Sequence, residues 1–381
     1  MNELKETFIA VMISIFRAGV KPEQKKEPAV SREIKRFHEN TAQSRLIPEI
    51  HSIQEVSPQQ ILEIAGLGEV YDELDGLPLQ QKLQQALDRG YKAVVADALD
   101  DEPYLSSRLS VFAQLRDEVI SGLRLCGKAL GLPDSALSVA VYQPMLYFLP
   151  KIAEEQEVPL KRYGGKYPVD LPLRQKGEEN GILYLGTGAL VHLHRAVYEM
   201  RRQTTAFVTL AGNCVSNPFN AELPLDMPFQ RALEFCGLAE NPTYICFGGS
   251  MTGEPVLDPE KTFVTPSTRA ILAFHSYDHV DAKPCIGCGR CMQVCPQRLP
   301  VFYLYQASVH KQLSVLRRMD AIPCLECGAC SYVCPSRLDI VPVLTQGYEM
   351  VRKRREQVAQ MISGDVKAQD LPQDGQEVSA Q

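Results

Sequence analysis

Eight of the 12 cysteines fall into two copies of one spacing, and this duplication constrains the chain more than any other feature. The copies are Cys285-x2-Cys288-x2-Cys291-x3-Cys295-Pro296 and Cys324-x2-Cys327-x2-Cys330-x3-Cys334-Pro335. Runs of this form bind pairs of [4Fe–4S] clusters, and the fourth cysteine of each run ligates the other run's cluster. The sequence therefore predicts a first cluster on Cys285, Cys288, Cys291 and Cys334, and a second on Cys324, Cys327, Cys330 and Cys295.

Zinc ions and disulfide bonds are the alternatives for these cysteines. C-x2-C pairs are typical of structural zinc sites, but zinc has no use for a third cysteine at i+6 followed by a duplicated Cys-Pro. Disulfides need an oxidising compartment, and the N-terminus lacks the basic start and small-residue cleavage site of a secretory signal. The pattern therefore favours iron–sulfur clusters and an electron-carrying chain.

Bulk properties limit the class of protein. A chain of 381 residues is long enough for two or three domains, and its net charge of −6 argues against nucleic acid as the main partner. No stretch reaches the roughly 18–20 apolar residues of a transmembrane helix. Abundant reduced thiols and clusters of an exposed type predict a cytoplasmic protein. The cysteines outside the runs lie among apolar residues and are predicted to be buried free thiols: Cys126, Cys214, Cys236 and Cys246.

The segments before the cysteine runs follow two patterns. Helices alternate with strands from Ser57 to about 200, which predicts an α/β domain with a parallel sheet covered on both faces. Ser57 as N-cap and Pro58 at the first helical position predict the start of one helix, and another helix is expected from about Arg108 to Leu130. Residues 204–250 form a strand, a helix beginning at Asp226 as N-cap, and a strand, which suggests a small β-grasp-like module. Helical spacing around the cysteine runs predicts an α-helical cluster domain. The expected domains are 1–50 (N-terminal helix and linker), 51–200 (α/β), 201–268 (β-grasp), 269–360 (two-cluster ferredoxin domain) and 361–381 (disordered tail).

Several short segments keep a fixed order ahead of the cysteine runs: Asp101-Glu102-Pro103-Tyr104-Leu105, Lys166-Tyr167-Pro168, Gly186-Thr187, the loop 212–220, and Phe247-Gly248-Gly249-Ser250-Met251-Thr252-Gly253. This order resembles the C subunit of Rnf-type electron transport complexes over about residues 57–350. It resembles, more distantly, the flavin-bearing NADH-binding subunit of respiratory complex I.

The resemblance implies a flavin/NADH-type α/β domain, a β-grasp domain of the soluble-ligand-binding (SLBB-like) kind, and a helical two-cluster domain. It also implies that electrons pass from NADH through FMN to the clusters and then to a membrane or soluble acceptor. On this resemblance the flavin site would comprise Gly66, Gly68, Glu102, Tyr104, Gly186 and Thr187.

The flavin-binding loop departs from the family pattern. The family's loop resembles G-x-G-G-A-G-F-P, whereas the segment here runs from Gly66 to Glu73 as GLGEVYDE. Its carboxylates, Glu69, Asp72 and Glu73, stand where a phosphate needs positive potential. Tyr184 replaces an asparagine, and only the Glu-Pro-Tyr end of the family's N-G-A-E-C-E-P-Y is kept, which makes Glu102 a candidate structural remnant. These departures argue against bound FMN and direct NADH oxidation, and FMN stays an open alternative.

Residues around the cysteines are expected to set the cluster potentials. Glycine N–H groups (Gly287, Gly289 and Gly328) can turn toward the sulfurs, and such hydrogen bonds raise a reduction potential, as does nearby positive charge. The flanking cations are Lys283, Arg290, Arg298 and Arg337. Glu326 acts in the opposite sense beside the second cluster, which is therefore predicted to have the lower potential.

Three functions follow, in order of preference. The first is an electron relay through two [4Fe–4S] clusters between a redox partner (a flavoprotein, a ferredoxin or a membrane electron-transport complex) and an acceptor. The alternative is an FMN-containing NADH-oxidising subunit of an ion-translocating oxidoreductase, or a cobalamin-reductase-like enzyme. The third is an assembly subunit anchored to a membrane complex through residues 1–20 or the basic run Arg352–Arg355, in a peripheral position on the inner face of the cell membrane.

Overall fold

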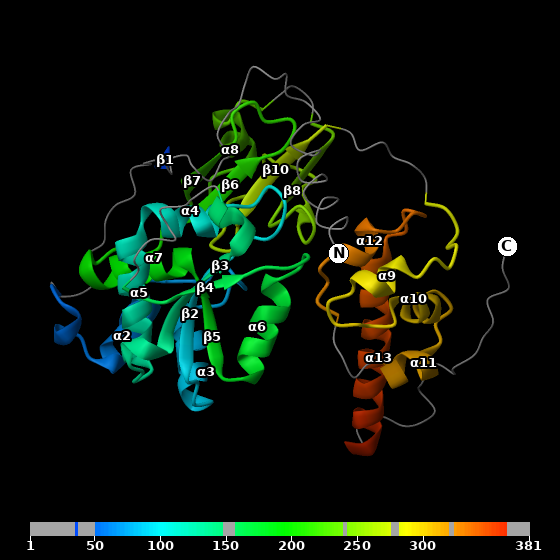
Figure 1. Cartoon of the computed structure of the whole chain (residues 1–381), viewed down its shortest axis with the longest axis horizontal. Helices are drawn as coiled ribbons and strands as arrows, with labels where there is room; N and C mark the ends of the chain where they lie inside the picture. Colours follow the sequence, from blue (N-terminus) through cyan, green and yellow to red (C-terminus); the bar gives the residue numbers. More distant parts are fainter. Residues whose placement is uncertain are drawn as a thin grey trace. The chain divides into compact units, whose positions relative to one another are not determined.

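The structure, a computed structural model, describes residues 50–147, 157–238, 242–275, 282–319 and 324–363, together with the backbone of residues 35–36. The chain divides into two compact units, residues 1–279 and 280–381 (Figure 1). The helix expected in residues 1–20 and the tail expected after residue 363 lie outside the described residues. Within the described ranges, no helix combines the length and apolar character needed to cross a membrane.

A four-stranded parallel sheet forms the centre of the first unit, as predicted. Its order is β4-β3-β2-β5, and the strands are β2 (Ala93–Ala98), β3 (Leu137–Tyr142), β4 (Leu160–Tyr163) and β5 (Ile182–Gly186). The chain proceeds from β2 to β3 and β4 on one side, then crosses to add β5 on the other side of β2. The carboxyl ends of β2 and β5 therefore meet at the topological switch point, where open α/β sheets bind their ligands.

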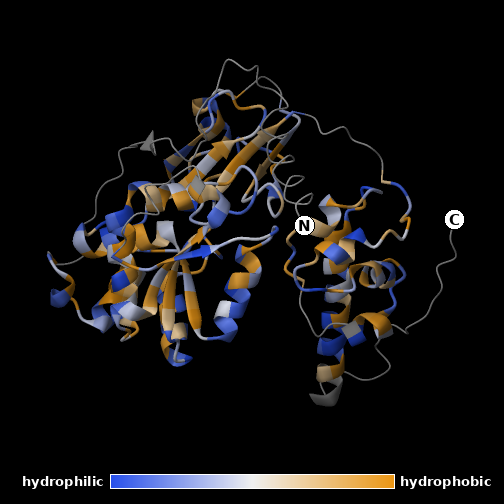
Figure 2. Cartoon of the chain, viewed as in Figure 1, coloured by the Kyte–Doolittle hydropathy of each residue, from blue (hydrophilic) through white to orange (hydrophobic). Residues whose placement is uncertain are grey.

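Helices cover both faces of this sheet. Helices α2, α5 and α7 lie on one face and α6 on the other (Figure 1), and Figure 2 shows apolar residues along the strands between them. Alternation along β2 places Val94 and Ala96 in the core with α5 and α7, and Val95 in a separate core with Tyr184 toward α6. The helices of this unit are η2 (Ile53–Glu55), α2 (Pro58–Leu67), α3 (Leu79–Asp88), α4 (Ser107–Gln114), α5 (Arg116–Ala129), η3 (Asp134–Ala136), η4 (Gln143–Tyr147), α6 (Asp170–Glu179) and α7 (Thr187–Tyr198).

Two local expectations have different outcomes. The helix start at Ser57 is confirmed: its side chain caps Gln60, the Gln60 side chain caps the Ser57 N–H, and Pro58 is the first helical residue. The single helix expected over residues 108–130 is instead two helices, α4 and α5, separated at Leu115. α4 packs against strands of the second sheet while α5 packs along α7, and one straight helix cannot do both.

The second sheet of this unit has the order β1-β7-β6-β10-β8-β9. An antiparallel hairpin (β6 and β7) is followed by helix α8, and β10 then pairs in parallel with β6 and antiparallel with β8. This is the β-grasp arrangement expected from the sequence. Its elements are β1 (Lys35–Arg36), β6 (Thr205–Ala211), β7 (Phe219–Pro224), α8 (Phe229–Phe235), β8 (Tyr244–Phe247), β9 (Glu254–Pro255) and β10 (Ala270–Phe274).

Three details of this sheet differ from expectation. β10 extends the module past the expected end at residue 268, and β1 brings a piece of the expected N-terminal linker against β7. Helix α8 begins after Pro228 and not at Asp226, which has φ 64°. A residue that precedes proline disfavours the helical region, so the helix cannot run from Asp226 through Met227.

The second unit is helical, as predicted. Its core joins the helices through Leu299, Leu304, Leu316, Ile340 and Leu344, and four of the cysteines pack against it from the side. The helices are α9 (Arg290–Val294), α10 (Val301–Val309), α11 (Leu313–Met319), α12 (Ala329–Tyr332) and α13 (Ile340–Ser363).

Candidate iron–sulfur centre

The two cysteine runs fold into the same local structure. In each run a glycine in the left-handed region leads into a short helix: Gly289 (φ 72°) precedes α9, and Gly328 (φ 75°) precedes α12. Three residues after the last cysteine of each run the backbone is left-handed again, at Arg298 (φ 54°) and Arg337 (φ 53°). The matching backbone shows that the duplicated spacing is a duplicated structure.

Each predicted ligand set lines one cavity. Cys285, Cys288, Cys291 and Cys334 line the first cavity, and Cys324, Cys327, Cys330 and Cys295 line the second. Each cavity thus takes three cysteines from one run and one from the other, which is the crossed arrangement expected from the spacing. Four thiolates around one space are the donor set that a [4Fe–4S] cluster requires, so the residues present fit the group.

The two cavities differ in burial. Cys285 and Cys288 are exposed, and Ile286 between them leaves 70% of its surface open to solvent. Cys327 and Cys330 are each only 7% exposed, and Val341 and Leu344 of α13 help to line their cavity. The first cavity is therefore at the surface of the second unit, residues 280–381, which we call the cluster unit. The second cavity is covered by protein.

Backbone N–H groups point at two of the sulfurs. The Leu299 N–H donates to Cys295 Sγ at 3.4 Å, and the Glu326 N–H donates to Cys324 Sγ at the same distance. Burial raises the pKa of the Cys324 thiol to about 11 and that of the Cys330 thiol to about 12. Thiolates at these positions therefore need the positive charge of iron to form.

Gly66 and Gly68, the first two residues of the predicted flavin site, belong to the end of helix α2. Gly66 is helical, and Gly68 ends the helix with its N–H donating to the Ile64 carbonyl at 2.7 Å. A Cβ on Gly68 would lie 2.9 Å from Ala196 Cβ on α7. Both glycines therefore have roles in helix packing here.

Gly186 and Thr187, at the start of α7, are surrounded by the loop that carries the three carboxylates. Glu73 accepts hydrogen bonds from the Gly188 N–H (2.7 Å) and the Ala189 N–H (2.9 Å). The Gly186 N–H donates to Asp72 at 3.0 Å, and the Asp72 carboxylate also pairs with Lys82. The Thr187 hydroxyl donates to the Arg108 carbonyl at 3.0 Å. Burial and the neighbouring Asp72 raise the pKa of Glu73 to about 7.

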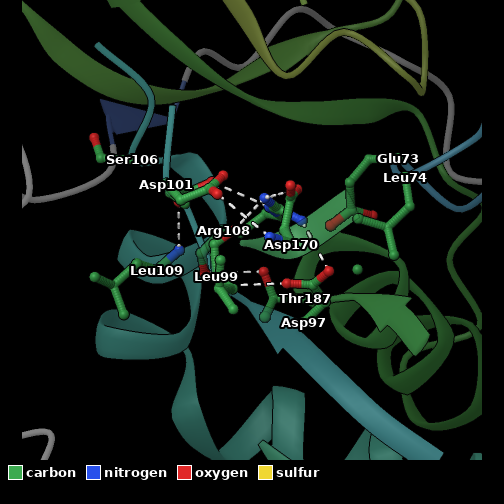
Figure 3. A network of polar contacts seen from close by, with 12 residues as sticks. Glu73, Leu74, Asp97, Leu99, Asp101, Ser106, Arg108, Leu109, Asp170 and Thr187 are labelled. Atoms are coloured by element: carbon green, nitrogen blue, oxygen red, sulfur yellow. Dashed lines mark hydrogen bonds and ion pairs between the residues drawn. The ribbon is translucent and has the colours of Figure 1, made fainter. Parts of the chain in front are cut away.

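A buried ion network lies beside this loop, at the carboxyl end of β2 (Figure 3). Arg108 on α4 contacts Asp97 and Asp100 at 3.0 Å and Asp170 at 3.2 Å. Burial works against ionisation of Asp170, but the two arginines beside it, Arg108 and Arg174, outweigh that effect and lower its pKa.

The pKa of Asp101, next to this network, shifts in the opposite direction to that of Asp170. Burial and the nearby Asp170 carboxylate raise the pKa of Asp101 to about 7. Its carboxylate accepts the backbone N–H groups of Val169 and Asp170, which lead into α6. Asp101 therefore fixes the start of α6 at the edge of the sheet.

Glu102 and Tyr104, the remaining predicted flavin-site residues, dock on the β-grasp sheet. Glu102 accepts a hydrogen bond from Thr252 Oγ1 at 2.5 Å, and a Cβ on Gly249 would lie 1.7 Å from its carboxylate. The Tyr104 ring meets the Phe274 ring edge-on, with centroids 5.2 Å apart. These contacts join the two sheets of the first unit and fit a structural role for Glu102.

The structure thus divides the sequence-predicted site residues. The eight cysteines come together in two groups, and the six candidate flavin residues are spread over three separate packing positions. Sequence reasoning missed the Arg108 network and the use of Asp72 and Glu73 as hydrogen-bond acceptors. The concentration of acidic residues in 97–102 and 69–75 is the only signal in the sequence.

Comparison with known proteins supports the presence of [4Fe–4S] clusters. Residues 277–335 match the 4Fe-4S dicluster domain family. The C subunit of the ion-translocating oxidoreductase complex of Rhodobacter capsulatus is 27% identical over 288 residues, which cover 70% of this chain and 54% of that protein. The protein of the same name from Pseudomonas aeruginosa is 30% identical over 294 residues, covering 68% of this chain and 36% of that protein. The chain therefore spans about half the length of these relatives or less.

A solved structure shares the fold. The crystal structure of an NAD+-reducing [NiFe]-hydrogenase in the H2-reduced state aligns with 95% of this chain and 77% of that chain, with a TM-score of 0.55 and 13% sequence identity.

The match to the 4Fe-4S dicluster domain confirms the predicted pair of [4Fe–4S] clusters and excludes the zinc and disulfide alternatives. Over some 70% of its length, the chain is a homologue of the C subunits of ion-translocating oxidoreductase complexes and carries a 4Fe-4S dicluster domain.

Proposed function

We propose that this chain relays electrons through its two [4Fe–4S] clusters between a redox protein and an acceptor complex, as an electron-transfer subunit of an ion-translocating oxidoreductase. The observation that carries the proposal is the pair of cavities lined by crossed cysteine sets. Cys291 and Cys295 lie four residues apart around helix α9, where the rise is about 6 Å. One side of the turn faces the first cluster and the other faces the second, so the two clusters are close neighbours.

The first cluster is the proposed port for the redox partner. It lies behind the exposed segment from Lys283 to Cys288, whereas the second cluster is covered by α13. The described residues of the cluster unit, 282–319 and 324–363, include 11 Lys and Arg and four Asp and Glu, within a chain of net charge −6. A basic surface around an exposed cluster fits an acidic redox protein, such as a ferredoxin or a flavoprotein.

The relatives' names place them in complexes that translocate ions, and we propose a peripheral position for this chain on such a complex, on the cytoplasmic face of the membrane. Fractionation of native extracts tests the position. We expect the chain to sediment with membranes at low salt and to be released by high salt or mild detergent. If the chain were fully soluble at low salt, the proposed association with a membrane complex would be wrong, while the proposed electron relay would still stand.

Substitution of single cysteines tests the relay and its crossed ligation. Protein purified without oxygen should hold about eight irons and eight sulfides. Reduction with dithionite should give an electron paramagnetic resonance spectrum of two interacting clusters. Cys334→Ala should perturb the same cluster as Cys285→Ala, and Cys295→Ala the same cluster as Cys324→Ala.

Cys126→Ala is the matched control, because Cys126 is buried in the α/β core far along the chain from both runs. It should leave the iron content and both signals unchanged. If Cys334→Ala instead perturbed the cluster held by Cys324, each run would hold its own cluster and the crossed assignment would be wrong.

A further inference from the structure

The start of α7 has the features of an anion site. It follows β5 at the topological switch point of the parallel sheet, and its first N–H groups have no partners within the helix. Such a helix start is where a cofactor phosphate binds in sheets of this topology. In this chain, a carboxylate of the protein itself occupies the position.

Glu73 occupies the place that a phosphate would take. Its two carboxylate oxygens accept the N–H groups of Gly188 and Ala189, and Asp72 takes the N–H of Gly186. The carboxylate also uses the space left by the missing side chain at Gly186, because a Cβ there would lie 2.1 Å from Glu73 Cδ. A phosphate at this position would have to displace Glu73 and would face the charge of Asp72.

The nearby cations are also engaged by carboxylates. Lys82 pairs with Asp72 and Asp75, and Arg108 pairs with Asp97, Asp100 and Asp170. Arg174, on α6, pairs with Asp170 at 3.3 Å. The charges of Lys82, Arg108 and Arg174 at this edge are therefore balanced by the chain's own carboxylates.

We infer that Glu73 and Asp72 close the switch-point crevice as an internal substitute for a ligand phosphate, so that the chain holds neither a flavin nor a nicotinamide nucleotide there. Two of the acidic residues in the loop, Asp72 and Glu73, then share one physical role. Carboxylates replace the glycines because they satisfy the N–H groups that a phosphate would otherwise satisfy. Electrons consequently reach the clusters from another protein and not from a nucleotide.

The test uses the full chain with its clusters, purified without oxygen, with FMN and inorganic phosphate as probes. Acid extraction of the wild type should release no stoichiometric flavin, and titrated FMN should not bind. Its thermal unfolding midpoint should be the same in millimolar phosphate as in chloride of equal ionic strength. Glu73→Ala should lower the midpoint, and phosphate should restore part of the loss because two helix N–H groups are opened.

Glu69→Ala is the matched control, since Glu69 is in the same loop but its side chain is 57% exposed and pairs with Arg202, a residue at the surface. It should behave like the wild type in both salts. If Glu73→Ala does not fold, Glu73→Gln keeps the size of the side chain, and its amide leaves one N–H without an acceptor, so a smaller response to phosphate is expected. One FMN per wild-type chain, wild-type binding of FMN, or equal phosphate responses of wild type and the folded Glu73 variant would overturn the inference. Cluster content and reduction by dithionite stay the same in every case, so this failure is distinct from a failure of the relay.

Discussion

Single residues distinguish the two otherwise repeated cluster motifs. Gly287 has φ 68° in the first run, and its counterpart in the second run, Glu326, has φ 52°. A side chain in the left-handed region costs about 1 kcal/mol relative to glycine. The chain keeps Glu326 in spite of this cost, and the carboxylate adds a negative charge beside the second cluster.

Two substitutions of Glu326 should separate the effect of its left-handed backbone on stability from the effect of its charge on the cluster potential. Glu326→Gln and Glu326→Gly should both raise the potential of the second cluster, by about 20–40 mV at low salt, because each removes one partly screened charge. Only Glu326→Gly should also stabilise the cluster unit, by about 1 kcal/mol. Redox titration followed by paramagnetic resonance measures the first effect and denaturant unfolding the second.

The control is Glu349→Gln, an exposed carboxylate on α13, which should shift neither potential measurably. The ordering of the clusters is tested in the same titration. If the buried second cluster were reduced before the exposed first cluster in the wild type, the predicted ordering would be wrong.

At the scale of elements, helix α13 is the larger counterpart of α10. Each helix follows its cysteine run after a proline and a left-handed arginine, and the two helices pack together in one core. α13 supplies Leu344, which is 2% exposed and lines the second cavity. The helix therefore limits solvent access to the covered cluster.

Leu344→Ala should open the side of the second cavity that α13 covers. We expect a loss of about 2–5 kcal/mol in the stability of the cluster unit and faster bleaching of the second cluster in air, with the first cluster less affected. Visible absorbance and paramagnetic resonance after exposure to oxygen measure the difference. Val358→Ala, at a 41%-exposed position on the same helix, should change neither property.

The junction of β2 with α6 should depend on pH through Asp101. Its pKa is raised to about 7 in the folded chain, so its protonated form favours folding. The stabilisation is complete below the unfolded pKa of about 4 and is lost as the pH rises toward 7. Between these pH values the wild type should lose on the order of 2–4 kcal/mol relative to Asp101→Asn, which cannot ionise.

Thermal or denaturant unfolding of both proteins from about pH 4 to 7 tests this sign. Asp88→Asn, at an exposed position at the end of α3, is the matched control. A stability difference for Asp101→Asn that stayed flat with pH would mean that Asp101 is ionised throughout.

At the scale of the whole molecule, charge is divided unevenly along the chain. The cluster unit is basic, although the chain as a whole is acidic. The cations beside the exposed cluster, Lys283 and Arg290, are themselves exposed. Long-range attraction to an acidic redox protein therefore acts where the cluster is accessible.

Electron transfer from a reduced acidic ferredoxin should slow as salt is added, because the attraction is screened beyond about 10 Å at 0.1 M. Lys283→Glu with Arg290→Glu should slow the second-order rate by up to about tenfold at low salt. Stopped-flow absorbance measures the rate. Reduction by a small neutral reagent should be unaffected.

The matched pair Arg352→Glu with Lys353→Glu, on α13, changes the same charge away from the first cavity. It should leave the ferredoxin rate close to that of the wild type. If this pair slowed transfer and the Lys283 pair did not, the partner would dock on α13, as the assembly-subunit alternative supposes.

Features that depend on neighbouring residues could be predicted from the sequence alone. The spacing of the cysteines predicted two clusters, and the capping residues Ser57 and Pro58 predicted the start of a helix, because ligation and capping act over a few residues. The alternation of strands and helices predicted the parallel sheet. The break at Leu115 was missed because it depends on α4 packing against a sheet whose strands begin about 90 residues later.

Tertiary structure decided the role of the acidic loop that contains Asp72 and Glu73. In the sequence, Glu73 is a negative charge where a phosphate would need a positive one, and it suggests repulsion. In the fold, a helix that starts 114 residues later directs its free N–H groups at that carboxylate and turns it into an internal ligand. Only the approach of distant segments creates such a bond, and it reveals why these acidic residues are tolerated inside the protein.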